Sequence, residues 1–241
     1  MRDSLYAKPV ESIEGFTFDE KVAAVFPDMI KRSVPGYATV IAMTGVLAGQ
    51  YAQAGSKCYD LGCSLGESSF AMADATTNID CSITAIDNSQ QMLDECQKRL
   101  QVIGASEKVE LLCADILDVD FDAASVAVMN YTLQFIDISQ RDALMKRLFD
   151  ALLPGGVLLL SEKIKSEDQP TNHRLIDMHH SFKKANGYSE LEISQKRTAL
   201  ENVLLPETIE DHKQRLSKAG FENIDIWFQC FNFMSLIAYR P

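Results

Sequence analysis

Short, continuous apolar runs alternate with helical patterns along most of the chain after residue 55. The runs lie at 57–61, 82–87, 109–114, 124–131 and 157–161. Successive residues in them are apolar, as expected for strands covered on both faces. Between two of these runs, Leu93, Cys96, Leu100 and Ile103 form one helical stripe within 90–103. The repeated order of strand and helix predicts an α/β fold around a mostly parallel sheet with right-handed crossovers.

Helix-stop and turn residues separate the last predicted elements of this pattern. A helical stretch at 139–153 is followed by Pro154, Gly155 and Gly156, which favour a helix stop and a turn. A second helix is predicted at 207–219, before Gly220. Two apolar segments, 224–231 and 234–239, are then separated by a short turn. This closing pair predicts an antiparallel hairpin at the edge of the sheet.

Two segments stand outside the alternation. Residues 1–54 precede the first strand and have a mostly helical pattern, so we expect a helical N-terminal cover. Residues 162–206 follow the fifth strand, are polar and show no strand pattern, so we expect a helical insertion. With 241 residues, the chain fits one domain, 1–241, that carries both additions.

Composition excludes several classes of protein. The 34 acidic and 23 basic residues give a net charge of −11, which disfavours an extended nucleic-acid groove. The six cysteines never form a CxxC pair, which favours free thiols in a reducing compartment. The N-terminus lacks the apolar core of a secretory signal, and no apolar run approaches the ~18 residues of a membrane span. We therefore expect a soluble, cytoplasmic protein without a membrane segment.

The most informative motif is the turn 59–67, with the sequence YDLGCSLGE. Gly62 and Gly66 permit a tight turn and the close approach of a ligand to the backbone. The spacing differs from the GxGxxG dinucleotide fingerprint, and the turn lacks the lysine of a P-loop. The helix that follows favours an anionic group such as a carboxylate at its start. Turns of this kind also occur without a ligand, so the motif needs support from elsewhere.

Polar residues at the ends of the next strands supply that support. Asp87 ends the second strand 21 residues after Gly66, near the offset at which a carboxylate accepts both ribose hydroxyls. The alternative is that Asp87 only caps the next helix. Asp115 follows the third strand and Asn130 ends the fourth. Because the carboxyl ends of parallel strands share one edge of the sheet, these positions indicate a single crevice.

This arrangement resembles the class I S-adenosylmethionine-dependent methyltransferases. The resemblance implies a Rossmann-like, seven-stranded sheet whose last strand is antiparallel, which agrees with the closing hairpin. It implies that Asp60 and Gly62 hold the methionine end of S-adenosyl-L-methionine, Asp87 the ribose and Asp115 the adenine. The chain departs from many members at Ser64, where they have a second glycine.

A closer resemblance covers almost the whole chain and rests on long, unusual strings. They are VFPDMI at 25–30, RSVPGY at 32–37, DLGCS at 60–64, NYTLQF at 130–135, LSEK at 160–163, HH at 179–180 with Lys183, ANGYSELEISQKR at 185–197 and WFQCFNF at 227–233. These strings resemble the carboxy-S-adenosyl-L-methionine synthases of the bacterial wobble-uridine (cmo5U34) tRNA modification pathway. A shared fold alone does not account for such strings.

This family resemblance implies a role for each site residue. The assigned contacts are Tyr37 closing over S-adenosyl-L-methionine, Gly62, Cys63 and Ser64 at its methionine part, Asp87 and Asn88 at the ribose, Asp115 and Ile116 at the adenine, and Asn130 facing the sulfonium. Arg197, as the catalytic residue, would hold the carboxylate of the product, because a planar guanidinium donates two parallel hydrogen bonds. The resemblance also implies a homodimer, so segment 162–206 is a candidate dimer arm. The sequence leaves open whether Arg197 serves the site of its own subunit or that of the neighbouring subunit.

The resemblance also implies a reaction that joins S-adenosyl-L-methionine and prephenate to give carboxy-S-adenosyl-L-methionine, phenylpyruvate and water. Prephenate supplies the carbon dioxide and the hydroxide that takes the methyl proton, so positioning and charge stabilisation replace a strong base. The sequence agrees, since it shows no Ser–His–Asp, HExxH or zinc-ligand spacing. His179 and His180 point about 100° apart on a helix, so we expect no metal site there.

Local charge favours a small anionic second substrate. Residues 163–197 hold seven basic and five acidic side chains, a net charge of +2, whereas the remainder of the chain totals −13. A dianion such as prephenate needs only a small basic pocket, while tRNA would need a broad basic face. The same counts also suit a solvated helical arm with no binding role.

Two other functions stay open at this point. A conventional S-adenosylmethionine-dependent methyltransferase, acting on a small acid or on the wobble uridine of tRNA, would share the fold and the same crevice. A non-enzymatic protein that binds S-adenosyl-L-methionine would share them as well.

Overall fold

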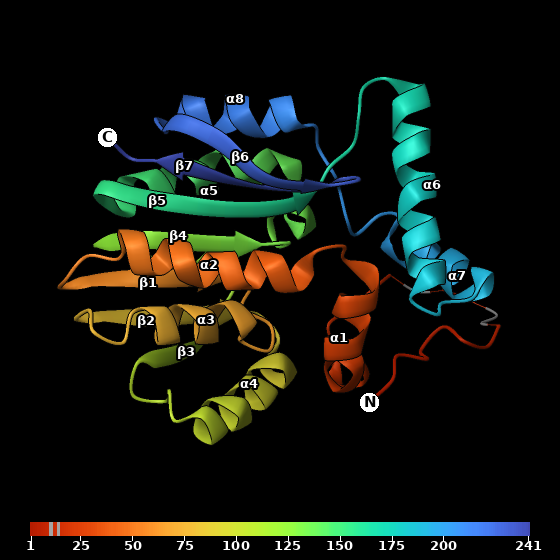
Figure 1. Ribbon diagram of the computed structural model, residues 1–241, viewed down its shortest axis with the longest axis horizontal. Coiled ribbons are helices and arrows are strands. Elements are labelled where there is room, and N and C mark those ends of the chain that lie inside the picture. The colour runs from red at the N-terminus through yellow and green to blue at the C-terminus, as the bar shows by residue number, and fades with distance from the viewer. Residues whose placement is uncertain (10–11, 14) are drawn as a thin grey trace.

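The computed structural model describes residues 1–9, 12–13 and 15–241, and over these residues one seven-stranded sheet forms the centre of the molecule (Figure 1). The strand order is β3-β2-β1-β4-β5-β7-β6. The strands are β1 (Ser56–Leu61), β2 (Cys81–Asp87), β3 (Val109–Cys113), β4 (Ala124–Asn130), β5 (Leu152–Lys163), β6 (Glu222–Cys230) and β7 (Phe233–Tyr239).

Strand direction follows the expectation from the sequence. Neighbouring strands from β3 to β5 pair in parallel, whereas β7 runs antiparallel to both β5 and β6. The closing hairpin therefore places the last strand inside the sheet and leaves β6 at the edge. This confirms the predicted Rossmann-like class I methyltransferase topology.

Helices cover both faces of the sheet. They are α1 (Glu20–Ser33), α2 (Tyr37–Tyr51), α3 (Glu67–Ala75), α4 (Gln90–Ile103), α5 (Ile138–Ala151), α6 (Gln169–Ala185), α7 (Glu190–Leu200) and α8 (Ile209–Ala219), with a 3-10 turn, η1, at Leu133–Phe135. Helix α4 has the predicted bounds because the Ser89 hydroxyl caps its start and Gly104, with φ 71°, ends it.

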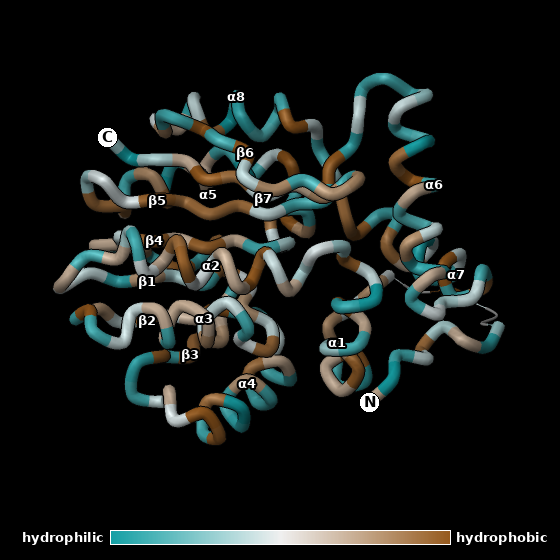
Figure 2. The backbone as a smooth tube through the Cα atoms, viewed as in Figure 1, coloured by the Kyte–Doolittle hydropathy of each residue, from teal (hydrophilic) through white to brown (hydrophobic). Residues whose placement is uncertain are grey.

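Two apolar cores lie on opposite faces of the sheet. In β4, Val126 and Val128 pack with α2, α3 and α4, while Ala127 and Met129 pack with α5 and α8. This alternation is the two-residue period of a strand, and both faces are apolar because both are covered. Figure 2 accordingly shows the apolar residues concentrated in the central strands β4 and β5.

The predicted helix 139–153 extends too far toward the C-terminus. The helix ends at Ala151, and Pro154, Gly155 and Gly156 lie within β5. Leu152 already pairs with Ala124 of β4, and the Gly155 N–H donates to the Arg240 carbonyl at 2.9 Å. Pairing with neighbouring strands thus outweighs the local turn signal.

Three helices of the two additional segments, α1, α6 and α7, gather beyond the carboxyl ends of the strands (Figure 1). In 1–54, helix is present at α1 and α2, and the described residues before Glu20 form none. Helix α2 packs against α3 and the sheet, whereas α1 lies beyond the end of the sheet. In 162–206 the helices are α6 and α7. Among the described residues, no helix is long and apolar enough to cross a bilayer.

A network of buried charged side chains links the end of segment 162–206 to helices α5 and α8. Arg141 of α5 is fully buried and donates to the carbonyls of Ile136 and Leu205 and to the Glu207 carboxylate. Arg215 of α8 donates two further bonds to Glu207, at 2.6 and 2.8 Å. Burial raises the pKa of Glu207, but the two guanidinium groups outweigh burial and hold it below its usual value.

We predict that Glu207→Gln destabilises the fold by about 3–5 kcal/mol, because it leaves two buried guanidinium groups without their carboxylate. Urea unfolding measures this loss, and Glu210→Gln, at an exposed position in the first turn of α8, is the control. A carboxylate whose pKa is lower in the folded than in the unfolded state stabilises the fold at pH values above its unfolded-state pKa. This stabilisation is lost as the pH falls through its folded-state pKa. The difference between wild type and Glu207→Gln should therefore shrink below pH ~4.5. Equal effects of the two variants would contradict the role of the network.

Candidate active site at the carboxyl ends of the strands

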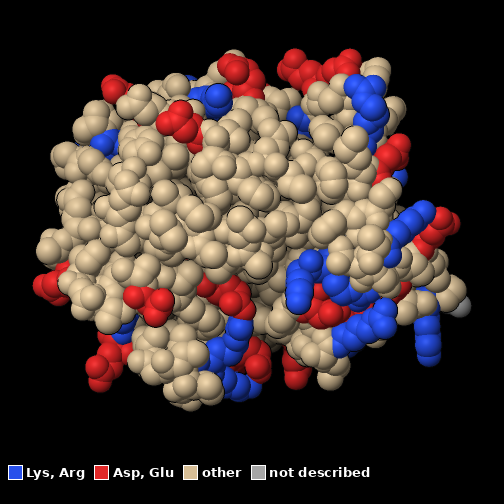
Figure 3. Space-filling model, viewed as in Figure 1, with Lys and Arg blue, Asp and Glu red and all other residues tan. Residues whose placement is uncertain are grey.

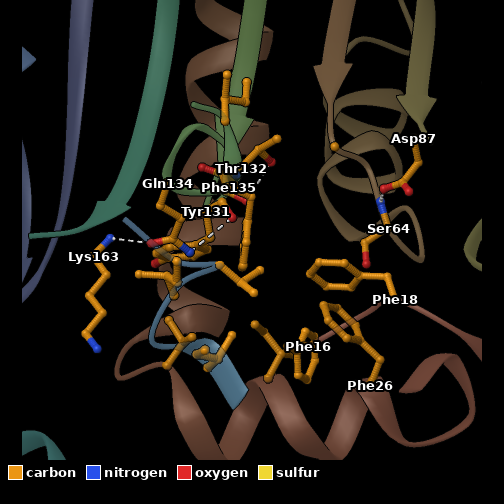
Figure 4. Close-up of a pocket in the computed structure, with 18 of the residues that line it drawn as sticks. Phe16, Phe18, Phe26, Ser64, Asp87, Tyr131, Thr132, Gln134, Phe135 and Lys163 are labelled. Atoms are coloured by element: carbon orange, nitrogen blue, oxygen red, sulfur yellow. Dashed lines mark hydrogen bonds between the residues drawn. The ribbon is translucent and has the colours of Figure 1, made fainter. Parts of the chain in front are cut away.

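A cavity of about 470 Å³ opens at the carboxyl edge of the sheet (Figure 4). Its floor comes from the ends of β1, β2, β4 and β5 and from the loop after β3, and its cover comes from residues 16–18, α1, α6 and α7. Of the ten site residues that the closer family resemblance implies, nine line it: Tyr37, Gly62, Cys63, Ser64, Asp87, Asn88, Asp115, Ile116 and Asn130. The structure thus brings these residues together, while their individual contacts with a ligand stay predictions.

The turn after β1 requires glycine at its first position. Gly62 has φ 78°, and a Cβ there would lie 2.3 Å from Oγ1 and 2.5 Å from Cγ2 of Thr132. The N–H groups of Gly62 and Cys63 both donate to the Ile86 carbonyl, at 2.8 and 2.9 Å. These two N–H groups are therefore not free for a ligand, and the turn offers it carbonyl oxygens instead.

Asp87 joins the two loops that shape the cavity. Its Oδ2 accepts the Ser64 N–H and its Oδ1 accepts the Ser89 N–H, both at 2.9 Å. Burial raises the pKa of Asp87, and these two N–H groups oppose that rise. The alternative role as the helix cap is wrong, because the Ser89 side chain caps α4. Each Asp87 oxygen keeps an acceptor site for a hydroxyl group.

Asn130 and Tyr37 are held in fixed orientations. The Asn130 amide donates to Thr44 at 3.2 Å and to Ser68 at 3.0 Å, and it accepts from Ser161 at 2.7 Å. Tyr37 begins α2, and its ring centroid lies 6.2 Å from that of Tyr131. Burial raises the pKa of Tyr37, so its phenol is neutral at physiological pH.

Two residues with predicted contacts lie outside the cavity of this chain. Asp60 is buried and accepts the Ser69 hydroxyl at 2.5 Å; burial raises its pKa to about 6. It positions α3 and does not line the cavity, and the contact of Asp60 with the methionine end stays a prediction. Arg197 is exposed on α7, and none of the described residues forms a hydrogen bond or an ion pair with its guanidinium.

Three lysines to which the sequence analysis assigns no site role line the cavity: Lys163 at the end of β5, Lys183 on α6 and Lys196 on α7. They belong to the basic segment counted above, but a count does not show which side chains face inward. Helical spacing carries that signal. Lys196 shares the buried face of α7 with Ile193 and Ala199, at intervals of three residues.

Phenylalanines from the N-terminal segment close the cavity on another side. The Phe18 ring centroid lies 5.2 Å from that of Phe16, 6.3 Å from that of Phe26 and 5.3 Å from that of Phe135, in edge-to-face arrangements. The Ser89 hydroxyl donates to the Phe18 carbonyl at 2.7 Å. This bond anchors the apolar cover to the loop that holds Asp87.

His179 also lines the cavity, as a neutral donor. Its Nε2 lies 2.8 Å from the Ser33 carbonyl oxygen, and its ring centroid lies 4.9 Å from that of Phe233. Burial and the nearby Lys183 and Lys163 lower the pKa of His179 to about 3. No group of three His, Cys, Asp or Glu side chains in the described ranges is arranged to hold a metal ion.

Comparison with known proteins identifies the family. Curated carboxy-S-adenosyl-L-methionine synthases from Sodalis glossinidius and Trichlorobacter lovleyi are 51% and 54% identical to this chain. The alignments span 100% and 99% of this chain and 97% and 98% of those relatives. The chain belongs to the carboxy-S-adenosyl-L-methionine synthase family. A methyltransferase domain model also matches residues 59–156.

Solved structures support the fold independently. Human N-acetylserotonin methyltransferase, in complex with S-adenosylmethionine, aligns with a TM-score of 0.61 at 16% identity, over 100% of this chain and 63% of that one. An O-methyltransferase family 2 protein from Planctomyces limnophilus, in complex with apigenin, aligns with a TM-score of 0.64 at 17% identity, over 93% and 62% of the two chains. At these identities the likeness shows a shared fold.

We predict that Gly62→Ala weakens S-adenosyl-L-methionine binding at least ~10-fold, because Thr132 has no room to accommodate a Cβ and the turn must shift. Calorimetry measures the affinity. Gly55→Ala is the matched control, because Gly55 has nearly the same φ, 76°, and a Cβ there meets nothing within 4 Å. Both variants lose about 1 kcal/mol of stability to the left-handed backbone. Equal binding by both variants would contradict the steric argument.

Proposed function

We propose that this protein converts S-adenosyl-L-methionine and prephenate into carboxy-S-adenosyl-L-methionine, phenylpyruvate and water. The observation that supports this most strongly is a cavity with two chemically different ends. Asp87 lies on one side and Lys163 on the other (Figure 4). A nucleoside with a cationic sulfur suits the first end and a dianionic acid suits the second. Family membership points to the same product.

The proposed S-adenosyl-L-methionine site uses the strand ends. Asp87 accepts the ribose hydroxyls, with Asn88 beside it, because its carboxylate is already oriented by two backbone N–H groups. The carbonyls of the turn 62–64 suit the ammonium of the methionine part. Asp115 and Ile116, in the loop after β3, border the adenine, and Tyr37 closes over the ligand.

The chemistry follows from prephenate itself. Loss of its ring carboxylate as carbon dioxide and of its ring hydroxyl as hydroxide makes the ring aromatic and leaves phenylpyruvate. The hydroxide takes one proton from the methyl group on sulfur, which forms water and an ylide. The ylide carbon then bonds to the carbon dioxide. Because the substrates supply the base and the electrophile, the protein's task is to position them and exclude water.

Arg197 is proposed to hold the new carboxylate in a neighbouring subunit's cavity. Within one chain Arg197 faces outward on α7, next to Lys196, which faces inward. Successive helical residues point about 100° apart, so both orientations belong to one regular helix. An exposed guanidinium one residue after the cavity-lining Lys196 fits a homodimer in which α6 and α7 form the contact.

We propose that the product serves tRNA wobble-uridine modification in the cytoplasm and that this protein does not bind tRNA over an extended surface. Over the face drawn in Figure 3, basic side chains gather near the N-terminal segment, α6 and α7, where acidic side chains are interspersed among them. A net charge of −11 repels a polyanion at long range, which supports this proposal.

We predict that the wild-type protein, incubated with both substrates, forms a species about 44 mass units heavier than S-adenosyl-L-methionine, as addition of carbon dioxide requires. Mass spectrometry detects it, and reactions without prephenate are the control. Formation of S-adenosylhomocysteine with an acceptor would instead support a conventional methyltransferase. Tight binding without turnover would support a binding protein.

We also predict that Arg197→Ala leaves S-adenosyl-L-methionine affinity within about threefold of wild type but weakens carboxy-S-adenosyl-L-methionine binding at least ~30-fold, since a charged hydrogen bond to the added carboxylate is lost. Calorimetry with both ligands measures this difference. Arg174→Ala, at an exposed position of α6, is the control. Equal losses of affinity for the two ligands would contradict this role of Arg197.

A further inference from the structure

The three cavity lysines come from three different elements and face the same space. Lys163 lies at the end of β5, Lys183 on the inner side of α6 and Lys196 on the inner side of α7. Segments far apart in the sequence thus converge to place three ammonium groups at the end of the cavity away from Asp87. Figure 4 shows Lys163 and Asp87 on opposite sides.

Two of these lysines, Lys183 and Lys196, are unusually buried, while Lys163 is partly exposed. Lys183 is 8% exposed and Lys196 is 6% exposed. Lysine is almost never buried to this extent without a partner, since removing a charge from water costs free energy. A buried ammonium without a counter-charge in the free protein therefore suggests that a ligand supplies one.

The described residues supply little counter-charge. Lys196 Nζ lies 3.8 Å from Asp3 Oδ2 and 3.4 Å from the Ser33 hydroxyl. Asp3 already accepts hydrogen bonds from the Tyr188 hydroxyl and the Leu5 N–H. In the described ranges, neither Lys163 Nζ nor Lys183 Nζ has a hydrogen bond or an ion pair within 4 Å. Among the residues that the structure describes, one carboxylate therefore serves three lysines, which leaves an excess of two positive charges when all three are protonated.

Other charged groups nearby do not remove this excess. Arg32 forms its own ion pair with Asp28 at 3.1 Å. His179, on the same helix as Lys183, is neutral, and His180 beside it also has a lowered pKa, from burial and from the nearby Lys183. Arg197 adds positive charge that acts on Lys163. An excess of two charges matches a dianion.

We propose that Lys183 and Lys196, together with Lys163, form the binding subsite of the dianionic second substrate, and that they hold the carboxylate that phenylpyruvate retains. This inference rests on the proposed function and specifies the residues that bind its second substrate. It assigns the two ends of the cavity to the two substrates.

The choice of carboxylate follows from the chemistry. The ring carboxylate loses its charge when it leaves as carbon dioxide, so an ion pair to it would stabilise the substrate more than the transition state and slow the reaction. The carboxylate of the pyruvyl side chain keeps its charge throughout. Lysines that hold this group bind substrate without opposing the step, and they leave the ring carboxylate free to face the sulfur.

The protonation of the lysines gives the subsite a pH dependence. Burial and the facing Lys196 and Lys163 lower the pKa of Lys183 to about 7, while Asp3 opposes this shift. Burial also lowers the pKa of Lys196, to about 8. In the free protein these lysines lose protons as the pH rises from 7 to 9, and only the protonated forms attract an anion. Affinity for the anion should therefore fall over this range.

The test compares Lys183→Met and Lys196→Met with the wild type, because methionine keeps an unbranched side chain and removes the charge. Lys184→Met is the matched control, because Lys184 follows Lys183 on α6 but is exposed and forms an ion pair with Glu190. Calorimetry measures the binding of phenylpyruvate and of S-adenosyl-L-methionine to each protein, and steady-state kinetics gives KM and kcat for prephenate. Thermal unfolding shows whether each variant folds.

We expect Lys183→Met and Lys196→Met to weaken phenylpyruvate binding and raise the prephenate KM at least ~10-fold, with S-adenosyl-L-methionine affinity within about threefold of wild type. Lys183→Met should unfold at the same or a higher temperature, because it removes a buried, unpaired charge. The decline in phenylpyruvate affinity between pH 7 and 9 should be smaller in Lys183→Met.

Unchanged phenylpyruvate binding in both variants would overturn the subsite, as would an equal loss in Lys184→Met. Lower stability of Lys183→Met with unchanged phenylpyruvate binding would assign that lysine a structural role instead. If wild-type protein forms no carboxylated product from prephenate, the proposed function fails. The binding of phenylpyruvate would still decide whether these lysines hold a keto acid.

Discussion

The cavity depends on the Asp87 carboxylate, which accepts a backbone N–H from each of two loops. One loop is the glycine turn after β1 and the other leads into α4, and the Ser64 and Ser89 N–H groups reach the two carboxylate oxygens at the same distance, 2.9 Å. Parallel pairing of β1 with β2 brings these loops to one edge. The same carboxylate is thus both a structural link and the proposed acceptor for ribose hydroxyls, which fixes where a nucleoside fits.

The opposite end of the cavity has the complementary character. Its lysines lie at the junction of β5, α6 and α7, and within the described ranges Asp3 is the carboxylate that lies near Lys196. A protein that kept such charges only for stability would gain by replacing them with apolar side chains. Their retention fits a site that completes its charge balance when an anionic substrate enters. Aromatic residues of the N-terminal segment enclose the space between the two ends.

Sequence patterns predict the features that depend on neighbours along the chain. The bounds of α4 follow from its apolar stripe and its caps, and Gly62 was identified from a turn that needs a left-handed residue. Contacts between segments that are far apart in the sequence cannot be predicted from such local patterns. The first residues of β5 pair with β4 despite Pro154, and Lys183 faces inward because of how α6 packs. The outward direction of Arg197 likewise follows from the orientation of α7 rather than from its local sequence.

The central claim is that the carbon added to S-adenosyl-L-methionine comes from prephenate inside the cavity. Prephenate labelled with carbon-13 in its ring carboxyl group tests this directly, with unlabelled bicarbonate in excess in solution and the product read by carbon-13 NMR. The account predicts that the label appears in the carboxylate attached to the sulfonium carbon, undiluted by the bicarbonate. Label found only in free bicarbonate, or a product carrying unlabelled carbon, would contradict it.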